Sequence, residues 1–152
     1  MSSQLESLGL SIKRLQHRHH RAMEIRLAPL GVSLVQWNAL REIDRNPGAS
    51  QHRLAELTFN SDQAFGTLIS RLLRLKLVER RPGAGRATLH RLTSKGEALL
   101  RQGRGPFLGV LANSFAPLNE EERVALMSLL EKLLSTDNLA PPRSKSRANS
   151  RE

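Results

Sequence analysis

Residues 61–75 combine an apolar stripe with a polar and basic one. Phe65, Leu68, Ile69 and Leu72 recur at three- and four-residue spacing, which predicts a helix with one buried face. The opposite face carries amide, hydroxyl and guanidinium groups, which match the donors and acceptors of base edges and phosphates in the major groove of duplex DNA. These side chains are Gln63, Thr67, Ser70, Arg71 and Arg74. The pattern predicts recognition of DNA.

Individual roles follow from the side-chain chemistry. We expect Gln63 to pair with adenine and Arg71 to reach guanine or a phosphate, with Thr67 and Ser70 touching bases or phosphates. Gly66 would let the helix approach the duplex closely. The alternative interpretation is an ordinary solvated helix face.

A second basic group surrounds a glycine-rich turn. Residues 77–81 and 86–92 predict two strands joined at residues 82–85, which form a β-wing. We expect Arg81 to contact DNA and Arg86, at the tip, to enter the minor groove, where negative potential attracts arginine. Arg53, on the preceding helix, is expected to anchor a phosphate. The alternatives for the wing are phosphate contact alone or no contact.

Helix caps place these groups on a helix-turn-helix. Ser50 and Ser61 are N-cap residues about eleven positions apart, and Ser33 caps an earlier helix that stops at residues 46–48. Long amphipathic helices are predicted on both sides. The first covers about residues 4–28, the second begins after Thr93 with a bend near residues 103–106, and the last follows a capping box at Asn119.

The predicted fold class is therefore mainly α with a small β-wing: a winged helix-turn-helix flanked by long N- and C-terminal dimerisation helices. We assign residues 1–32 and 93–135 to a helical dimerisation region and residues 33–92 to the DNA-binding lobe. Residues 136–152 are predicted to be a disordered basic tail, because they have almost no apolar content.

Composition narrows the class of protein. The formal net charge of +10 favours a polyanionic partner. The chain has no cysteine, which excludes disulfides, thiolate metal sites and thiol redox sensing, and aromatic residues make up only 3%, which disfavours base stacking on single strands. With no signal-peptide or membrane-span pattern, the expected location is the cytoplasm and no membrane partner is expected.

The motif order resembles the MarR (multiple antibiotic resistance regulator) family. The resemblance rests on residues 54–57 (LAEL), Leu72, residues 77–80 (LVER), Arg86 and residues 92–96 (LTSKG), and it covers about residues 5 to 135. It implies a homodimer that places one recognition helix and one wing on each half of a pseudo-palindromic operator. One departure is Ala84, which stands where the family usually carries an Asp that orients the tip arginine.

The resemblance also implies a ligand site between the dimerisation helices and the DNA-binding lobe. In this chain a small amphipathic or aromatic ligand would be lined by Leu15, His19, Met23, Trp37, Leu40 and Phe107. The alternative, that the same residues are plain core, is favoured by their helical spacing. His17 and His20 share a helix face, but no cysteine or carboxylate set completes a metal site, so neither a metal nor a cofactor is expected.

No nucleophile–base pair, phosphate-binding loop or paired acids are recognisable, so the chain is not expected to be an enzyme. The predicted function is a sequence-specific, double-stranded DNA-binding transcriptional regulator, a repressor released by a small ligand. The first alternative is a nonspecific architectural DNA-binding protein. The second is a protein-interaction module that does not touch DNA.

Overall fold

The computed structural model describes residues 1–85 and 88–135. The chain forms two compact units, Met1–Ser114 and Phe115–Glu152. The helices within the described residues are α1 (Ser2–Leu27), the short 3-10 helix η1 (Ala28–Leu30), α2 (Leu34–Arg45), α3 (Gln51–Leu57), α4 (Asp62–Arg74), α5 (Ser94–Phe115) and α6 (Glu120–Leu134). The strands are β1 (Val78–Pro82) and β2 (Thr88–Leu92). The predicted fold class, mainly α with a two-stranded wing, is confirmed.

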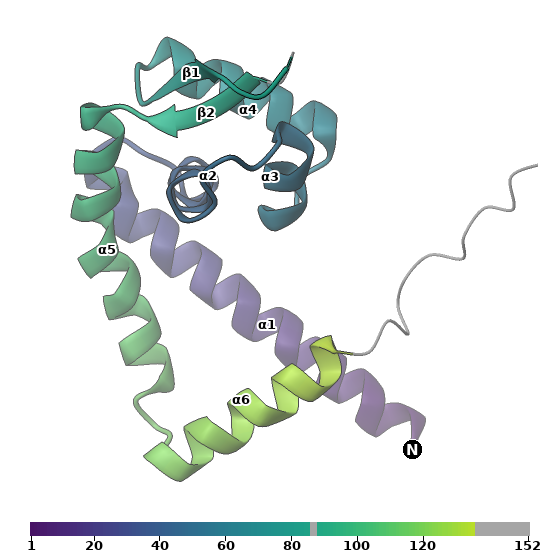
Figure 1. Cartoon of the computed structure of the whole chain (residues 1–152). Coiled ribbons are helices and arrows are strands. Elements are labelled where there is room, and N and C mark those ends of the chain that lie inside the picture. Colours follow the sequence, from purple (N-terminus) through teal and green to yellow (C-terminus); the bar gives the residue numbers. More distant parts are fainter. Residues whose placement is uncertain (86–87, 136–152) are drawn as a thin grey trace, which may run out of the picture. The chain divides into compact units, whose positions relative to one another are not determined.

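The first unit begins with the long helix α1, whose C-terminal end lies against the lobe formed by α2–α4 and the wing and whose N-terminal part extends away from it (Figure 1). Pro29 and Gly31 end it as expected: Pro29 lies in η1, and Gly31 has a φ of 72°, a left-handed conformation that glycine adopts without strain. Met23 and Leu27, near the end of α1, are buried in the core of this unit.

The three predicted serine caps are confirmed. Ser33 accepts from Gln36 N and forms a capping box, Ser50 accepts from Arg53 N, and Ser61 accepts from Ala64 N, each at 3.1 Å. These caps start α2, α3 and α4, whose apolar faces meet in one core. Its largest fully buried side chains are Trp37, Phe65, Leu27, Leu40, Leu54 and Leu72. The core holds α4 by one face and leaves the other to solvent.

The turn between α3 and α4 is a tight Schellman ending. Phe59 N donates to Glu56 O at 3.1 Å and Asn60 N donates to Ala55 O at 2.9 Å, which satisfies carbonyls at the end of α3. The position between them must be left-handed, and Phe59 has a φ of 57° there. Its side chain is 98% exposed. An aromatic residue thus occupies a position that glycine fills best.

The wing is an antiparallel hairpin in which Val78 pairs with Leu92 and Arg80 with His90. Val78, His90 and Leu92 are buried, whereas Arg80 and Arg91 are exposed. Beyond the hairpin, Thr93 Oγ1 accepts from Gly96 N at 3.1 Å, as expected for the residue that opens α5. Gly96 must lack a side chain, because a Cβ there would lie 2.1 Å from Leu77 O.

Helix α5 is locked to α2 through one tryptophan. Trp37 Nε1 donates to Leu100 O at 3.3 Å, and its ring stacks on Phe107 with centroids 4.6 Å apart. A Cβ on Gly103 would fall 2.2 Å from Trp37 Nε1, so only glycine permits this approach. Pro106 lies inside α5, which continues without interruption to Phe115, and the segment predicted to bend remains helical.

The second unit contains α6. Asn119 and Glu122 form the predicted capping box, with Glu122 N donating to Asn119 Oδ1 and Asn119 N donating to Glu122 Oε2, both at 2.9 Å. No residue of α6 is buried, and Val124 and Met127 are 65% and 58% exposed. Helix α6 therefore carries exposed apolar side chains.

No helix in the described part of the chain is long and apolar enough to cross a membrane.

Candidate DNA interface

Helix α4 presents the predicted recognition face to solvent. Phe65, Ile69 and Leu72 are at most 3% exposed and fix the helix on the core. The five predicted contact residues of this helix are all exposed: Gln63, Thr67, Ser70, Arg71 and Arg74. The structure therefore brings these side chains together on one open surface.

The two hydroxyl groups of this face are engaged by the helix itself. Thr67 Oγ1 donates to Gln63 O at 3.2 Å, and Ser70 Oγ donates to Gly66 O at 3.0 Å. Such back-bonding uses the hydroxyl proton and leaves oxygen lone pairs outward. In this conformation both residues offer acceptors, which suit base amino groups. Gly66 lies beside α3, since a Cβ there would be 3.4 Å from Gln51 Nε2.

The predicted arginines differ in whether acidic groups already hold them. Among the described residues, Arg71 and Arg74 have no ion pair within 4.0 Å, so their charges are available to a polyanion. Arg53 is paired, because its guanidinium Nη1 lies 3.1 Å from Glu56 Oε2. Arg81 is also paired, 3.0 Å from Glu79 Oε1. Arg86 lies outside the described residues.

Glu79 organises the outer face of the wing. Its Oε1 accepts from Arg81 and also from Arg91 Nε, the residue directly opposite it in the hairpin. One carboxylate thus restrains two arginines that the charge pattern alone treats as equivalent to Arg80. The Glu79–Arg91 pair follows from the hairpin register, in which the two residues lie opposite each other.

His90 is buried on the inner face of the wing. Burial, and to a lesser extent the nearby Arg80 charge, lower the pKa of its imidazole below the usual value of 6.5. Its Nδ1 has no hydrogen-bond partner. The side chain is therefore held neutral beneath the strand that carries Arg80.

An ion-pair network that the sequence did not reveal joins α3 to the start of α4. His52 Nδ1 lies 2.8 Å from Asp62 Oδ1, and His52 Nε2 lies 3.4 Å from Glu56 Oε1. These carboxylates, Asp62 first, raise the pKa of His52 above 6.5. The pairing depends on the angle between the two helices, which local sequence patterns do not give.

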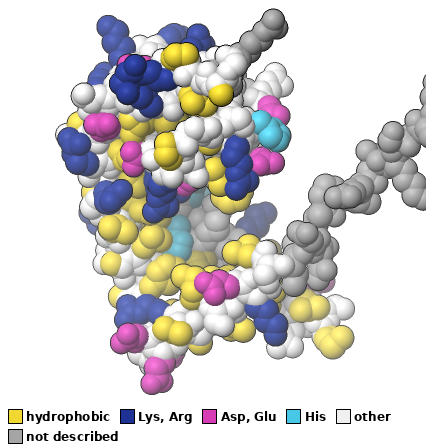
Figure 2. Space-filling view, viewed as in Figure 1, with side chains coloured by type: hydrophobic (Ala, Val, Ile, Leu, Met, Phe, Trp, Pro, Cys, Tyr) yellow, Lys and Arg dark blue, Asp and Glu magenta, His cyan; other side chains and the backbone are white. Residues whose placement is uncertain are grey.

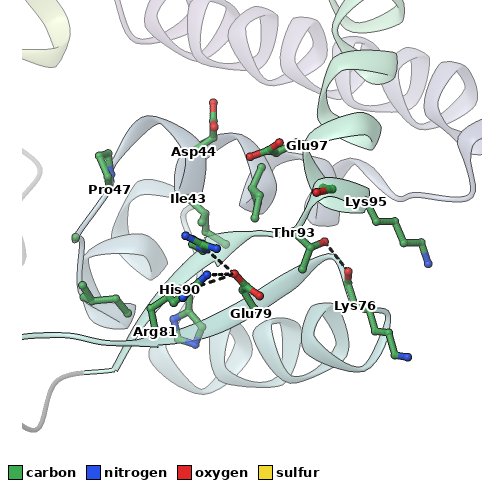
Figure 3. A pocket seen from close by; sticks show the side chains of 15 residues that line it. Ile43, Asp44, Pro47, Lys76, Glu79, Arg81, His90, Thr93, Lys95 and Glu97 are labelled. Atoms are coloured by element: carbon green, nitrogen blue, oxygen red, sulfur yellow. Dashed lines mark hydrogen bonds and ion pairs between the residues drawn. The ribbon is translucent and has the colours of Figure 1, made fainter.

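A groove of about 870 Å³ lies between the end of α2, the outer face of the wing and the start of α5 (Figure 3). Asp44, Glu79 and Glu97 line it together with Lys76, Arg81 and Lys95, so its charges are mixed. Thr93 Oγ1 donates to Lys76 O at 2.6 Å across its floor. None of the six residues predicted to line a ligand pocket lines this groove.

The six predicted pocket residues fall into three environments. Met23, Trp37 and Leu40 lie in the core with exposed fractions of 6%, 2% and 0%. Phe107 stacks on Trp37, and His19 Nε2 lies 2.6 Å from Ser114 Oγ. Leu15 is 38% exposed on α1. The structure brings Trp37 and Phe107 together, and a ligand pocket at these residues stays a prediction.

Arg41 adds a cation to this aromatic pair. Its guanidinium carbon lies 5.5 Å from the Trp37 ring and 5.2 Å from the Phe107 ring. Cations at this distance are attracted to aromatic faces. The sequence reasoning did not include Arg41, although its position one helical turn after Trp37 places both on one side of α2.

Basic side chains are spread over the surface of the lobe that contains α2–α4 and the wing (Figure 2). Among the described residues, no group of three or more His, Cys, Asp or Glu side chains is placed to hold a metal ion. A capped helix with an exposed polar and basic face, followed by a two-stranded wing, defines the winged helix-turn-helix class of DNA-binding proteins.

Comparison with known proteins narrows this class. The MarR family model matches residues 30–87. The HTH-type transcriptional repressor Rv2887 of Mycobacterium tuberculosis is 29% identical over 109 residues, which span 70% of this chain and 78% of the relative. The HTH-type transcriptional repressor Mb2911 of Mycobacterium bovis matches with the same identity and coverage. The chain is therefore similar to the MarR family over residues 30–87 and to these transcriptional repressors over 109 residues.

Solved structures agree in fold. The M. tuberculosis MarR family protein Rv2887 in complex with p-aminosalicylic acid has a TM-score of 0.70 at 27% identity, covering 84% of this chain and 98% of that one. Rv2887 in complex with DNA has a TM-score of 0.67 at 26% identity, covering 83% and 96%. A mutant MarR from Escherichia coli complexed with operator DNA has a TM-score of 0.78 at 23% identity, covering 88% and 98%, which shows the fold.

Proposed function

We propose that the protein is a transcriptional repressor that binds a pseudo-palindromic operator in duplex DNA as a homodimer and is released by a small ligand. The observation that carries this proposal is the outer face of α4. It presents Gln63, Arg71 and Arg74 to solvent on a helix whose other face is held by the core. A rigid helix with free polar and basic groups is suited to the major groove.

A homodimer is supported by the apolar side chains that one chain leaves uncovered. Leu5, Leu8 and Ile12 of α1 are 64%, 55% and 48% exposed. Val124 and Met127 of α6 are exposed to a similar degree. Contiguous apolar faces of this kind mark protein interfaces. We assign residues 1–32 and 93–135 to dimerisation and residues 33–92 to DNA binding.

We place the ligand beside the junction of the dimerisation helices and the DNA-binding lobe. Rv2887 has been crystallised with salicylic acid and with p-aminosalicylic acid, and we infer that an aromatic acid is the ligand class here. The Trp37–Phe107 stack with the Arg41 cation above it supports this choice, because it combines aromatic surface with a positive charge. The protein acts in the cytoplasm by binding and not by catalysis.

Fluorescence anisotropy with two DNA duplexes of equal length tests the proposal. One duplex contains the intergenic region upstream of the protein's own gene, and the other has the same bases in scrambled order. We expect a preference of about a thousandfold or more for the upstream duplex. Arg71→Ala should remove most of this preference, whereas the control Arg101→Ala, which removes the same charge from α5, should retain it.

A salt series separates specific recognition from general attraction. Equal affinity for both duplexes, with a steep fall as salt rises, would identify a nonspecific architectural protein. Absence of binding to any duplex at low salt would contradict a DNA-binding function and favour a protein-interaction module. Addition of salicylate should lower the affinity for the upstream duplex if the ligand class is correctly inferred.

A further inference from the structure

The first residue of α4, Asp62, is acidic, which is unexpected on a surface proposed to bind DNA. Asp62 does not serve as the helix cap, since Ser61 Oγ already accepts from Ala64 N at 3.1 Å. Its two carboxylate oxygens instead lie 2.8 and 3.1 Å from His52 Nδ1. The carboxylate is therefore fixed by a side chain of α3 and not by its own helix.

His52 is held between two carboxylates. Its Nε2 lies 3.4 Å from Glu56 Oε1, and Glu56 in turn binds Arg53 at 3.1 Å. The acidic neighbours raise the pKa of His52, so that the imidazolium is favoured. Asp62 and Glu56 thus form one connected group with His52 and Arg53 between α3 and the start of α4, and its charges balance when His52 is protonated.

The held carboxylate still faces solvent. The Asp62 side chain is 67% exposed, and it precedes Gln63, the first polar residue of the predicted recognition face. Residues at the N-terminus of a recognition helix are the ones that contact base edges. A carboxylate only accepts hydrogen bonds, so it is repelled by phosphates and by the acceptors of guanine, whereas cytosine offers its N4 amino group.

We propose that Asp62 is a specificity-determining residue that accepts a hydrogen bond from the N4 amino group of a cytosine. His52 is the positioning residue that orients this carboxylate and offsets its charge near the phosphates. The inference rests on the proposed function and names a base that the recognition helix α4 selects.

Selection from a library of randomised duplexes tests the assignment. Wild-type protein should enrich a cytosine at one position of each half-site. Asp62→Ala should reduce the preference for that cytosine by about tenfold or more, while preferences at other positions remain. The control Glu97→Ala removes an exposed acid from the first turn of α5 and should leave every preference unchanged. Thermal melting of each variant verifies that it is folded.

His52 is tested separately by its protonation. Anisotropy is measured with the selected duplex and with one in which the cytosine is replaced, at several pH values from 6 to 8. The wild-type preference should fall as pH rises and His52 loses its proton, since the charge that faces Asp62 and Glu56 is lost. His52→Ala should show a weaker preference that does not change over this range.

Three results would overturn the inference. They are an unchanged cytosine preference in Asp62→Ala, a selected adenine in place of cytosine, and a His52→Ala variant with the wild-type preference and pH profile. A wild-type protein that enriches no sequence at all would instead contradict the proposed function. The two failures are therefore distinguishable in the same selection.

Discussion

The recognition helix α4 and the terminal helices α1 and α6 differ in how their apolar faces are covered. In α4, Phe65 and Leu72 are fully buried within one chain. In α1, Leu8 and Ile12 are about half exposed, and no residue of α6 is buried. The comparison shows that one chain buries the apolar face of α4, whereas the apolar side chains of α1 and α6 are left exposed, where we propose that a second copy covers them.

The largest effect should come from opening the core under α4. Phe65→Ala removes a fully buried ring and should lower the free energy of unfolding by about 3–5 kcal/mol. Val35→Ala, at a side chain 42% exposed in the same lobe, is the control and should change it by no more than about 0.5 kcal/mol. Urea unfolding followed by circular dichroism measures both. Equal losses would show that the lobe is not an independent core.

A charge on the exposed apolar face of α1 should prevent dimerisation and leave the DNA-binding lobe folded. Ile12→Asp should yield monomers in analytical ultracentrifugation, because the carboxylate would be buried against the second copy. Operator affinity should fall by about a hundredfold or more, since two linked half-sites are no longer engaged together. Ser11→Asp adds the same charge to the same helix at an exposed serine and should remain dimeric. A dimeric Ile12→Asp would contradict the assignment of this face.

A smaller effect of opposite sign is expected in the turn between α3 and α4. Phe59 adopts a left-handed conformation with its side chain in solvent, so Phe59→Gly should raise the free energy of unfolding by about 0.5–1 kcal/mol. Lys76→Gly provides a matched comparison, because Lys76 also has a φ of 57° at the end of a helix. Thermal melting measures both variants. A loss of stability in Phe59→Gly would mean that the ring makes a stabilising contact.

The smallest effect concerns the wing. Burial lowers the pKa of His90, so the unfolded chain binds a proton more readily than the folded one just below pH 6.5. The free energy of unfolding therefore falls as pH drops below 6.5 toward the pKa of His90 in the folded protein. His90→Leu should therefore lose less stability than the wild type between pH 7.5 and 5.5. Urea unfolding at both values gives the difference, and an equal loss would argue against a neutral buried His90.

Local sequence rules predicted most of the fold because its boundaries depend on neighbouring residues. Ser33, Ser50, Ser61 and Asn119 each cap a helix by accepting from the backbone N–H three positions further along the chain. The exposed face of α4 was predictable for the same reason, since the buried positions recur with helical periodicity. These features required no knowledge of tertiary contacts.

Contacts between elements could not be predicted in this way. The His52–Asp62 pair depends on the angle between α3 and α4, and the stacking of Trp37 on Phe107 depends on how closely α5 approaches α2. The pairing of arginines with Glu79 depends on the hairpin register. The sequence identifies the arginines but not which of them are already bound by a carboxylate. In the structure Arg53 and Arg81 are so bound. Arg71 and Arg74 are therefore the better candidates for contacting phosphates.

The tryptophan that locks α2 to α5 also gives the protein an optical reporter. The chain contains one Trp and no Tyr, so its near-ultraviolet emission arises from a single indole. That indole lies against Phe107, beneath Arg41 and over Gly103. Any movement of the DNA-binding lobe relative to α5 changes the surroundings of this fluorophore. Stopped-flow emission of the unlabelled protein can therefore time such a movement during operator binding or release.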